Sequence, residues 1–249
     1  MHRILSIIIS ICFIVGIWHV SVQFFFLSPL LVPSPFTVGS EMVELLKSPD
    51  WWHDTWATLY RFTAGLLMGT LGGVAGGFIL CMFVGVDRVL SGCVDFFRSV
   101  PIAALIPLVM LLFGIGDNAK IVLSAFVVAL LMLVQTKYGI RDADTVRLTV
   151  GRLFRWDLIT RWRCVVFYEA LPAVLHGFRL AISFSLIVVV VSEMIMGASY
   201  GVGTGILNAQ LVYNTSEMYA RIIFIGMIGF IMNMLYLKFE NSALHWVGK

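Results

Sequence analysis

The stretch TLYRFTAGLLMGTLGGVAGGFILCMFV, residues 58–84, decides the fold class. Its only charged side chain is Arg61, and the apolar remainder is long enough to cross a bilayer, which takes about 20 residues in a helix. Glycines recur at every fourth position: Gly65, Gly69, Gly73 and Gly77. Glycines at this spacing form one smooth helix face that lets another backbone approach closely. We expect this face to serve helix packing, either within the chain or against another subunit.

The whole chain has the composition of a membrane protein. Of its 249 residues, 60% are hydrophobic and only 12% are charged, and the mean hydropathy is +0.96. The first apolar stretch follows Arg3 without a small-x-small cleavage site, so we expect an uncleaved first helix. The fold class is therefore all-α and polytopic, with residues 1–249 as a single transmembrane domain. Hydropathy predicts six spans, at about 4–26, 58–84, 89–113, 120–138, 178–197 and 219–238.

Positive charge predicts the orientation of these spans. With the N-terminus inside, twelve lysines and arginines fall in cytoplasmic segments and two, Lys47 and Lys120, fall outside. The bias favours N-in and C-in topology. It places a loop of about 139–177 in the cytoplasm and a segment of about 28–57 on the periplasmic side.

The periplasmic segment contains two further signals. The Pro-Ser-Pro at 33–35 stops any helix, and the stretch FTVGSEMVELLK that follows it can form a short surface helix. Trp51, Trp52 and Trp56 come next, and tryptophans are enriched where a membrane meets water. We therefore expect these three side chains at the membrane interface.

The cytoplasmic loop is unusually basic for so apolar a chain. Six arginines crowd into it: Arg141, Arg147, Arg152, Arg155, Arg161 and Arg163. Its apolar residues recur at helical spacing in two blocks, and Asp157 is placed to cap the second block. We expect two short amphipathic helices joined by a turn near Arg155 and Trp156. Because Trp156 and Trp162 suit either lipid or a protein partner, both interpretations stay open at this point.

Two charged residues are candidates for a solute path. Arg98 lies within an apolar stretch, and charges at membrane depth are costly and usually face a bundle interior or a water-filled path. Asp95, three residues earlier, can instead pair with Arg98 on one helix face. Glu193 follows an apolar run and suits either a hydrogen bond between helices or the passage of solute.

The sequence predicts no catalytic residue, cofactor or metal ion. No Gly-x4-Gly-Lys-Ser/Thr phosphate-binding motif occurs in it, and the glycines of GVGTG at 201–205 are followed by no lysine. Its histidines are scattered, without the spacing of a metal site. If ATP drives this protein, a separate chain must bind it.

Motifs in order along the chain give a family resemblance. They are VPSPFTV, HDTWATLYRFTAGLLMG, RSVPIAALIPLVMLLFGIGDNAK, ALPAVLHGFR and SEMIMGASYGVGTGILNAQ. Together they resemble the permease subunits of ABC importers of the nitrate, sulfonate and taurine type, and this resemblance implies a location in the inner membrane of a bacterium. The main alternative is a self-sufficient secondary transporter or channel, a class that tends to have internal repeats. We find no convincing repeat in the sequence.

The resemblance implies a coupling loop and a set of partners. In the family, this cytoplasmic loop docks on the ATPase, which makes the following residues candidates for coupling: Arg152, Arg155, Trp156, Asp157, Trp162 and Pro172. The family's Glu-Ala-Ala and the glycine after it are replaced here by residues 149–151 and Arg155. The implied partners are a cytoplasmic ABC ATPase dimer, a second permease copy forming a homodimer, an extracytoplasmic solute-binding protein and the lipid bilayer; nucleic acid is not among them.

The charge bias makes the topology testable. We expect single cysteines introduced at Asp144 and at Ser199, in a chain whose native cysteines are replaced, to react with an impermeant reagent from opposite sides of the membrane. Labelling of both positions from the same side would contradict the orientation.

Overall fold

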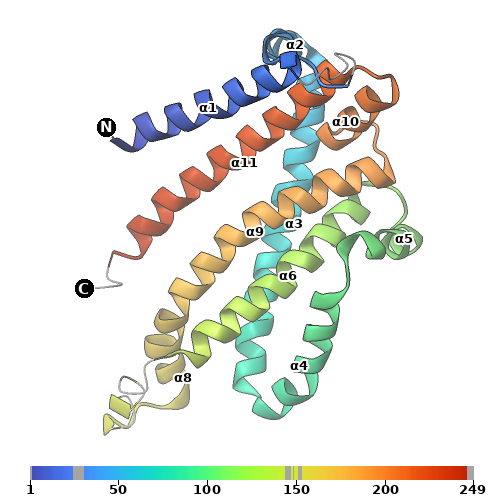
Figure 1. The fold of residues 1–249 in the computed structure, drawn as a ribbon. Helices are drawn as coiled ribbons and strands as arrows, with labels where there is room; N and C mark the ends of the chain where they lie inside the picture. Colours follow the sequence, from blue (N-terminus) through green and yellow to red (C-terminus); the bar gives the residue numbers. More distant parts are fainter. Residues whose placement is uncertain (1, 25–30, 144–146, 148, 151–152, 246–249) are drawn as a thin grey trace. The chain divides into compact units, whose positions relative to one another are not determined.

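The computed structural model describes residues 2–24, 31–143, 147, 149–150 and 153–245 (Figure 1). All the regular structure in these residues is helical, which confirms the all-α fold. In chain order the elements are α1 (His2–Phe24), α2 (Pro35–Lys47), α3 (Pro49–Met82), α4 (Val84–Ser99), α5 (Ile102–Phe113), α6 (Asp117–Arg141), α8 (Leu158–Arg161), η1 (Trp162–Val166), α9 (Phe167–Met196), α10 (Val202–Leu211) and α11 (Thr215–Ala243).

Within the described residues, four helices are long and apolar enough to cross a membrane. They are α3, α6, the continuous helix Ile159–Met196 and α11, and the bent pair of α4 and α5 adds a fifth if it counts as one span. The described apolar part of α1, Cys12–Gln23, is shorter than these. Four of the expected spans, 58–84, 120–138, 178–197 and 219–238, therefore lie in helices that could cross a membrane, and the span at 89–113 corresponds to the bent pair.

The third expected span, 89–113, is not one straight helix. Helix α4 ends at Ser99, α5 begins at Ile102, and the two are bent by 101°. Pro101 lacks the N–H that a continuing helix needs, and its ring forces Val100 into an extended conformation, with ψ at 125°. Pro107 lies inside α5 without ending it.

The chain divides into two compact units. One comprises residues 1–58 and 199–228, and the other comprises residues 59–198 and 229–249. In the second unit, α5, α6 and α9 share an apolar core of Ile106, Ala119, Leu123, Val188 and Met196. Helix α3 then packs on α6 through its glycines.

In the first unit, the segment before α3 is well capped. Ser34 accepts a hydrogen bond from the backbone N–H of Thr37 and so begins α2, as expected from the Pro-Ser-Pro stop. Trp51, one of the three tryptophans expected at the membrane interface, is 2% exposed, and its ring centroid lies 4.8 Å from that of Phe224. Because α3 begins at Pro49, the tryptophans lie on different faces of a helix, and Trp51 lies on the face that packs inside the protein. Trp52 and Trp56 are exposed.

The second of the two short helices expected in the basic loop is not a separate helix. Helix α8 runs through a π-helical turn, η1, directly into α9. The apolar pattern after Asp157 is therefore the beginning of a long membrane helix. The segment that joins α6 to α8 covers only about 142–157, and Arg152 lies outside the described residues.

The four glycines of α3 lie against α6. A Cβ added at Gly69 would lie 2.5 Å from the carbonyl oxygen of Ala125 and 2.6 Å from the Cβ of Val128. A Cβ at Gly65, Gly73 or Gly77 would also come within 3 Å of α6 atoms. Because no real Cβ tolerates such distances, any larger residue must push the two helices apart.

This contact predicts a large loss of stability for substitutions at Gly69 and Gly73 and a small effect at the neighbouring Gly72. We expect Gly73→Leu and Gly69→Leu to destabilise the folded permease by about 1–3 kcal/mol, the usual cost of overpacking. Gly72→Leu is the matched control, because a Cβ at Gly72 would meet nothing within 4 Å. Leu67→Ala, at an exposed position, should also be mild. Thermal unfolding in detergent measures all four variants, and equal melting temperatures for Gly72→Leu and Gly73→Leu would contradict the packing role.

Candidate functional site

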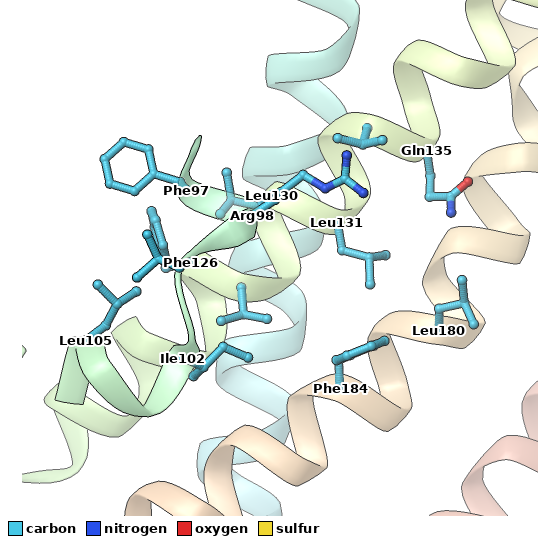
Figure 2. A pocket seen from close by; sticks show the side chains of 13 residues that line it. Phe97, Arg98, Ile102, Leu105, Phe126, Leu130, Leu131, Gln135, Leu180 and Phe184 are labelled. Carbon is cyan, nitrogen blue, oxygen red and sulfur yellow. The ribbon is translucent and has the colours of Figure 1, made fainter. Parts of the chain in front are cut away.

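Arg98 lies at the C-terminal end of α4, beside an apolar cavity. Its guanidinium is 3.6 Å from the carboxylate of Asp95, and both side chains are exposed. The cavity has a volume of about 340 Å³ and is lined mainly by α6, with further residues of α4, α5 and α9 and with Arg98 and Gln135 as its polar members (Figure 2). Glu193, the other sequence candidate, does not line this cavity. The structure thus does not bring the two candidates to one site.

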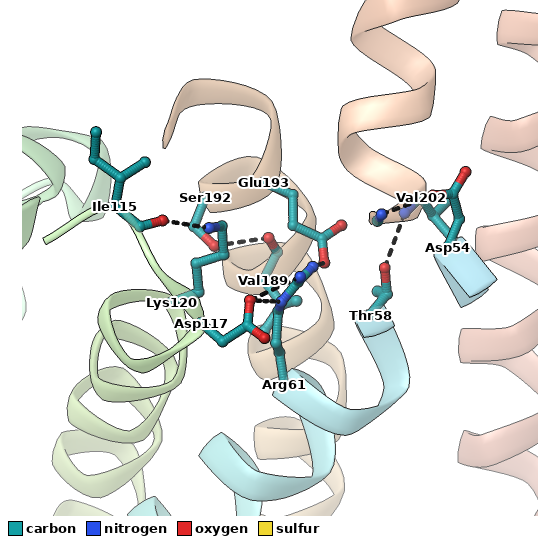
Figure 3. Close-up of polar contacts among 11 residues, drawn as sticks. Asp54, Thr58, Arg61, Ile115, Asp117, Lys120, Val189, Ser192, Glu193 and Val202 are labelled. Atoms are coloured by element: carbon teal, nitrogen blue, oxygen red, sulfur yellow. Dashed lines mark hydrogen bonds and ion pairs between the residues drawn. The ribbon is translucent and has the colours of Figure 1, made fainter. Parts of the chain in front are cut away.

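Glu193 belongs to a cluster of buried charges in the second unit. Its side chain is fully buried, and its Oε1 accepts a 2.5 Å hydrogen bond from Arg61 of α3. The same guanidinium donates through Nε to Asp117 of α6 at 2.9 Å (Figure 3). Lys120, on the next turn of α6, is also buried and donates to the carbonyl oxygen of Ile115 at 2.9 Å. One arginine therefore joins three helices.

Local structure explains why this arrangement needs Arg61. Asp117 is the first residue of α6, where a carboxylate interacts favourably with the helix dipole. Glu193 lies in the last turn of α9, where the dipole disfavours a negative charge. Removing one partner of a buried ion pair typically costs about 3–5 kcal/mol, because the other charge is left uncompensated.

Sequence reasoning singled out Glu193 but did not pair it with Arg61. The two residues are 132 positions apart, and no local spacing connects them. A usable signal existed, because each is a charge in an apolar helix and the two have opposite signs. Charges at membrane depth usually pair with one another.

In the first unit, a second charged cluster holds the beginning of α10. The backbone N–H groups of Gly201 and Val202 donate to Asp54 and Thr58 of α3 at 2.8 and 2.9 Å. Arg221 of α11 donates to Asp54 at 2.8 Å. The GVGTG stretch thus begins a helix whose first N–H groups are occupied by side chains of this chain.

The packing of Arg221 explains why position 205 of that stretch is a glycine. The Arg221 guanidinium lies against Gly205, where a Cβ would overlap it. The guanidinium also donates to Glu217 at 2.8 Å and lies 5.6 Å from the ring centroid of Trp51. Arg221 is therefore enclosed by two carboxylates, an aromatic ring and the backbone of α10.

The candidate coupling residues lie around a strained turn. Arg155 has a positive φ of 52°, which is uncommon for a residue with a side chain. The rings of its two chain neighbours, Phe154 and Trp156, stack on each other with centroids 6.2 Å apart. Phe154 is 70% exposed. A sharp turn thus presents aromatic side chains to the surroundings.

Asp157 caps the helix that follows this turn. Its carboxylate accepts hydrogen bonds from the Thr160 side chain and from backbone N–H groups, and these hold the pKa of Asp157 below its usual value. Trp162, in the π-helical turn, packs edge-on against Phe78 of α3. Pro172 lies inside α9. These residues share one end of the second unit, with the exception of Pro172, which lies further along the helix.

Comparisons with known proteins give the fold an identity. A solved structure of the MetNI methionine ABC transporter in inward-facing conformations superimposes with a TM-score of 0.67, at 19% identity, covering 78% of this chain and 98% of that chain. This likeness shows the fold of an importer permease.

Sequence relatives extend over almost the whole chain. An Escherichia coli (strain K12) permease protein named for aliphatic sulfonate transport is 29% identical over 233 residues, covering 94% of this chain and 88% of the relative. A Bacillus subtilis (strain 168) protein of the same name is 28% identical over 233 residues, covering 94% of this chain and 84% of the relative. The Escherichia coli taurine transport system permease protein is 22% identical over 245 residues, covering 96% of this chain and 89% of the relative.

A family model decides the assignment. The model described as "Binding-protein-dependent transport system inner membrane component" matches residues 63–240, which confirms the resemblance seen in the motifs. These proteins are the membrane subunits of ABC importers, and ATP hydrolysis belongs to a different subunit. The chain therefore belongs to the family of binding-protein-dependent transport system inner membrane components and is an ABC importer permease subunit.

Proposed function

We propose that this permease passes a small solute from an extracytoplasmic binding protein into the cytoplasm of a bacterium, as a homodimer on two copies of a cytoplasmic ATPase. The proposal rests on membership of the importer family, whose permeases work with an ATPase and a binding protein. A second copy is supported by the small number of spans, since so few helices make a thin wall around a solute path. Residues 1–249 act as one transmembrane domain, with N-in and C-in orientation.

The contact with the ATPase lies at the turn around Arg155. The single observation that carries this assignment is the strained, exposed turn with stacked Phe154 and Trp156. This turn lies in the basic loop of a chain whose sequence has no ATP site motif. Strained backbone persists only where surrounding structure enforces it, and it concentrates at functional sites. Aromatic and arginine side chains also supply most of the binding energy at protein interfaces.

A tryptophan substitution tests this contact. We expect Trp156→Ala to weaken ATPase binding by about 2 kcal/mol, which is roughly a 30-fold loss, because an anchoring aromatic ring is removed. Copurification of the ATPase with the permease in detergent measures the loss. Trp56→Ala is the control, since Trp56 is also an exposed tryptophan but lies in α3, outside the basic segment. Arg155→Ala should behave like Trp156→Ala.

A rival interpretation predicts a different result. If the turn rests on lipid, Trp156→Ala leaves the ATPase bound and lowers only the affinity for anionic vesicles. Wild-type ATPase recovery in Trp156→Ala, Arg155→Ala and the double variant would show that this turn is not the docking element.

We further propose that Glu193 fastens helices and that the solute does not bind to it. Its carboxylate is fully buried against Arg61, so it is not available to a passing solute in this conformation. The pair holds α3 and α9 together near the ends of their spans that the charge bias places toward the periplasmic side. Arg98, exposed beside its cavity, remains the candidate for contact with a mobile ligand.

A double-mutant cycle separates fastening from solute binding. We expect Arg61→Met to destabilise the permease by about 3–5 kcal/mol, because Glu193 loses its buried partner. Adding Glu193→Met should recover most of this loss, since a buried pair can often be replaced by apolar side chains of similar volume. Asp117→Asn should have a weaker effect, as water reaches the half-exposed Asp117 side chain. Unchanged thermal stability in Arg61→Met would contradict the fastening role.

A further inference from the structure

A second, polar cavity adjoins the apolar cavity beside Arg98. It lies between α4 and α6, has a volume of about 230 Å³, and is lined by Ser91, Val94, Asp95, Arg98, Val134, Lys137, Tyr138 and Arg141. Arg98 and Val134 line both cavities. The two therefore form one groove with a polar chamber and an apolar chamber, which we call the α4–α6 groove. All its residues are described and belong to the second unit.

The polar chamber carries one net positive charge. Its cations are Arg98, Lys137 and Arg141. The carboxylates that face them are Asp95 in the chamber wall and Asp87 behind it, which is bound to both Lys137 and Arg141. Three cations against two carboxylates leave a net charge of +1. One monovalent anion would balance this charge.

The cations keep hydrogen-bonding capacity for such an anion. Among the described residues, Arg98 has only the 3.6 Å ion pair with Asp95, and half of its side chain is exposed. Arg141 donates to Asp87 at 2.5 Å through one terminal nitrogen, and its side chain is 65% exposed. A guanidinium has five N–H donors, so most of those on both arginines are unused within the described residues. Tyr138 adds a hydroxyl group to the same wall, whereas the Ser91 hydroxyl already donates to Asp87 and accepts from Lys137.

The apolar chamber continues the groove along α6. Arg141 is the last residue of α6, and the polar chamber takes residues of its final two turns. The apolar chamber takes earlier turns, from Phe126 to Val134, a rise of about 12 Å. This is shorter than one leaflet of the hydrocarbon core, which is about 15 Å deep. Figure 2 shows Arg98 reaching from α4 across α6, above the side chains of Leu131 and Phe184.

This order of chambers matches one kind of molecule. An anionic headgroup would sit at the helix end, and an aliphatic chain would run from it toward the middle of the bilayer. Phe97, Leu180 and Phe184 are partly exposed along the groove, so its apolar side must be covered by something apolar at membrane depth. We propose that the α4–α6 groove binds a monoanionic phospholipid, with its phosphate on Arg98 and Arg141 and one acyl chain in the apolar chamber.

Native mass spectrometry of the permease purified with its ATPase tests the proposal. With added phosphatidylglycerol or phosphatidylcholine, we expect the wild-type complex to retain the anionic lipid about tenfold more strongly, a difference of about 1.4 kcal/mol. Arg98→Gln and Arg141→Gln should each remove most of this preference, since each loses a charge-assisted hydrogen bond to the phosphate. Asp87 keeps Lys137 as a partner in Arg141→Gln, so the fold is preserved.

Two further variants control for charge and for shape. Arg88→Gln removes a cation from α4 that lines neither chamber, and it should retain the wild-type preference. Val134→Phe keeps every charge but fills the junction of the chambers, and it should lower retention of both lipids. Equal lipid preference in Arg88→Gln and Arg98→Gln would overturn the proposal. The proposal would also be overturned if the wild-type complex bound no lipid in the groove and a second permease copy covered it.

The same chemistry, an anionic head on an aliphatic chain, also occurs in free solutes. Hexane-1-sulfonate is therefore the competing probe. We expect millimolar hexane-1-sulfonate to leave phosphatidylglycerol bound, because it lacks the second chain and the membrane anchorage. A different result would assign the groove to a solute and overturn the lipid assignment. In that result, hexane-1-sulfonate displaces the lipid from the wild-type complex, and Arg98→Gln abolishes binding of hexane-1-sulfonate.

Discussion

The close approach of α3 to α6 is the constraint on which the second unit depends. Lipid offers no hydrophobic force between helices, so their association rests on packing and on polar contacts. Glycines on α3 bring the two backbones together, and Ser124 then lies where it can exchange a 2.9 Å hydrogen bond with Ser185 of α9. The same approach brings Arg61 to Asp117 and Glu193. Small residues and buried charges are therefore parts of one arrangement.

Charges in this permease fall into two physical classes. Arg61 with Glu193, and Arg221 with Asp54, are buried pairs whose geometry is fixed by neighbouring helices. Arg98 and Arg141 are exposed, with only part of their hydrogen-bonding capacity used within the described residues. The first class stabilises a helix arrangement, and the second remains available to something outside the chain.

Much of the fold could be predicted from the sequence, because its strongest signals are local. Hydropathy located the apolar helices, the glycine spacing located the face at Gly69 and Gly73, and motif order indicated the importer family. Features that depend on tertiary contacts were missed. The pairing of Arg61 with Glu193 joins distant positions, and the burial of Trp51 depends on where α3 begins. The break at Pro101 lies inside a stretch that hydropathy treats as one span, and its bend of 101° depends on how α5 packs on α6 and α9.

The continuity of Ile159–Met196 has a mechanical consequence. Thirty-eight residues in one helix make a rod about 57 Å long, well beyond the thickness of the hydrocarbon core. One end of the rod adjoins the strained turn at Arg155, and the other carries Glu193 against Arg61. A push at the first end travels along hydrogen-bonded backbone to the second, with the π-helical turn and Pro172 as the points of least stiffness. Force applied to the helix at one surface of the bilayer would thus reach the Arg61–Glu193 ion pair near the opposite surface without passing through a hinge loop.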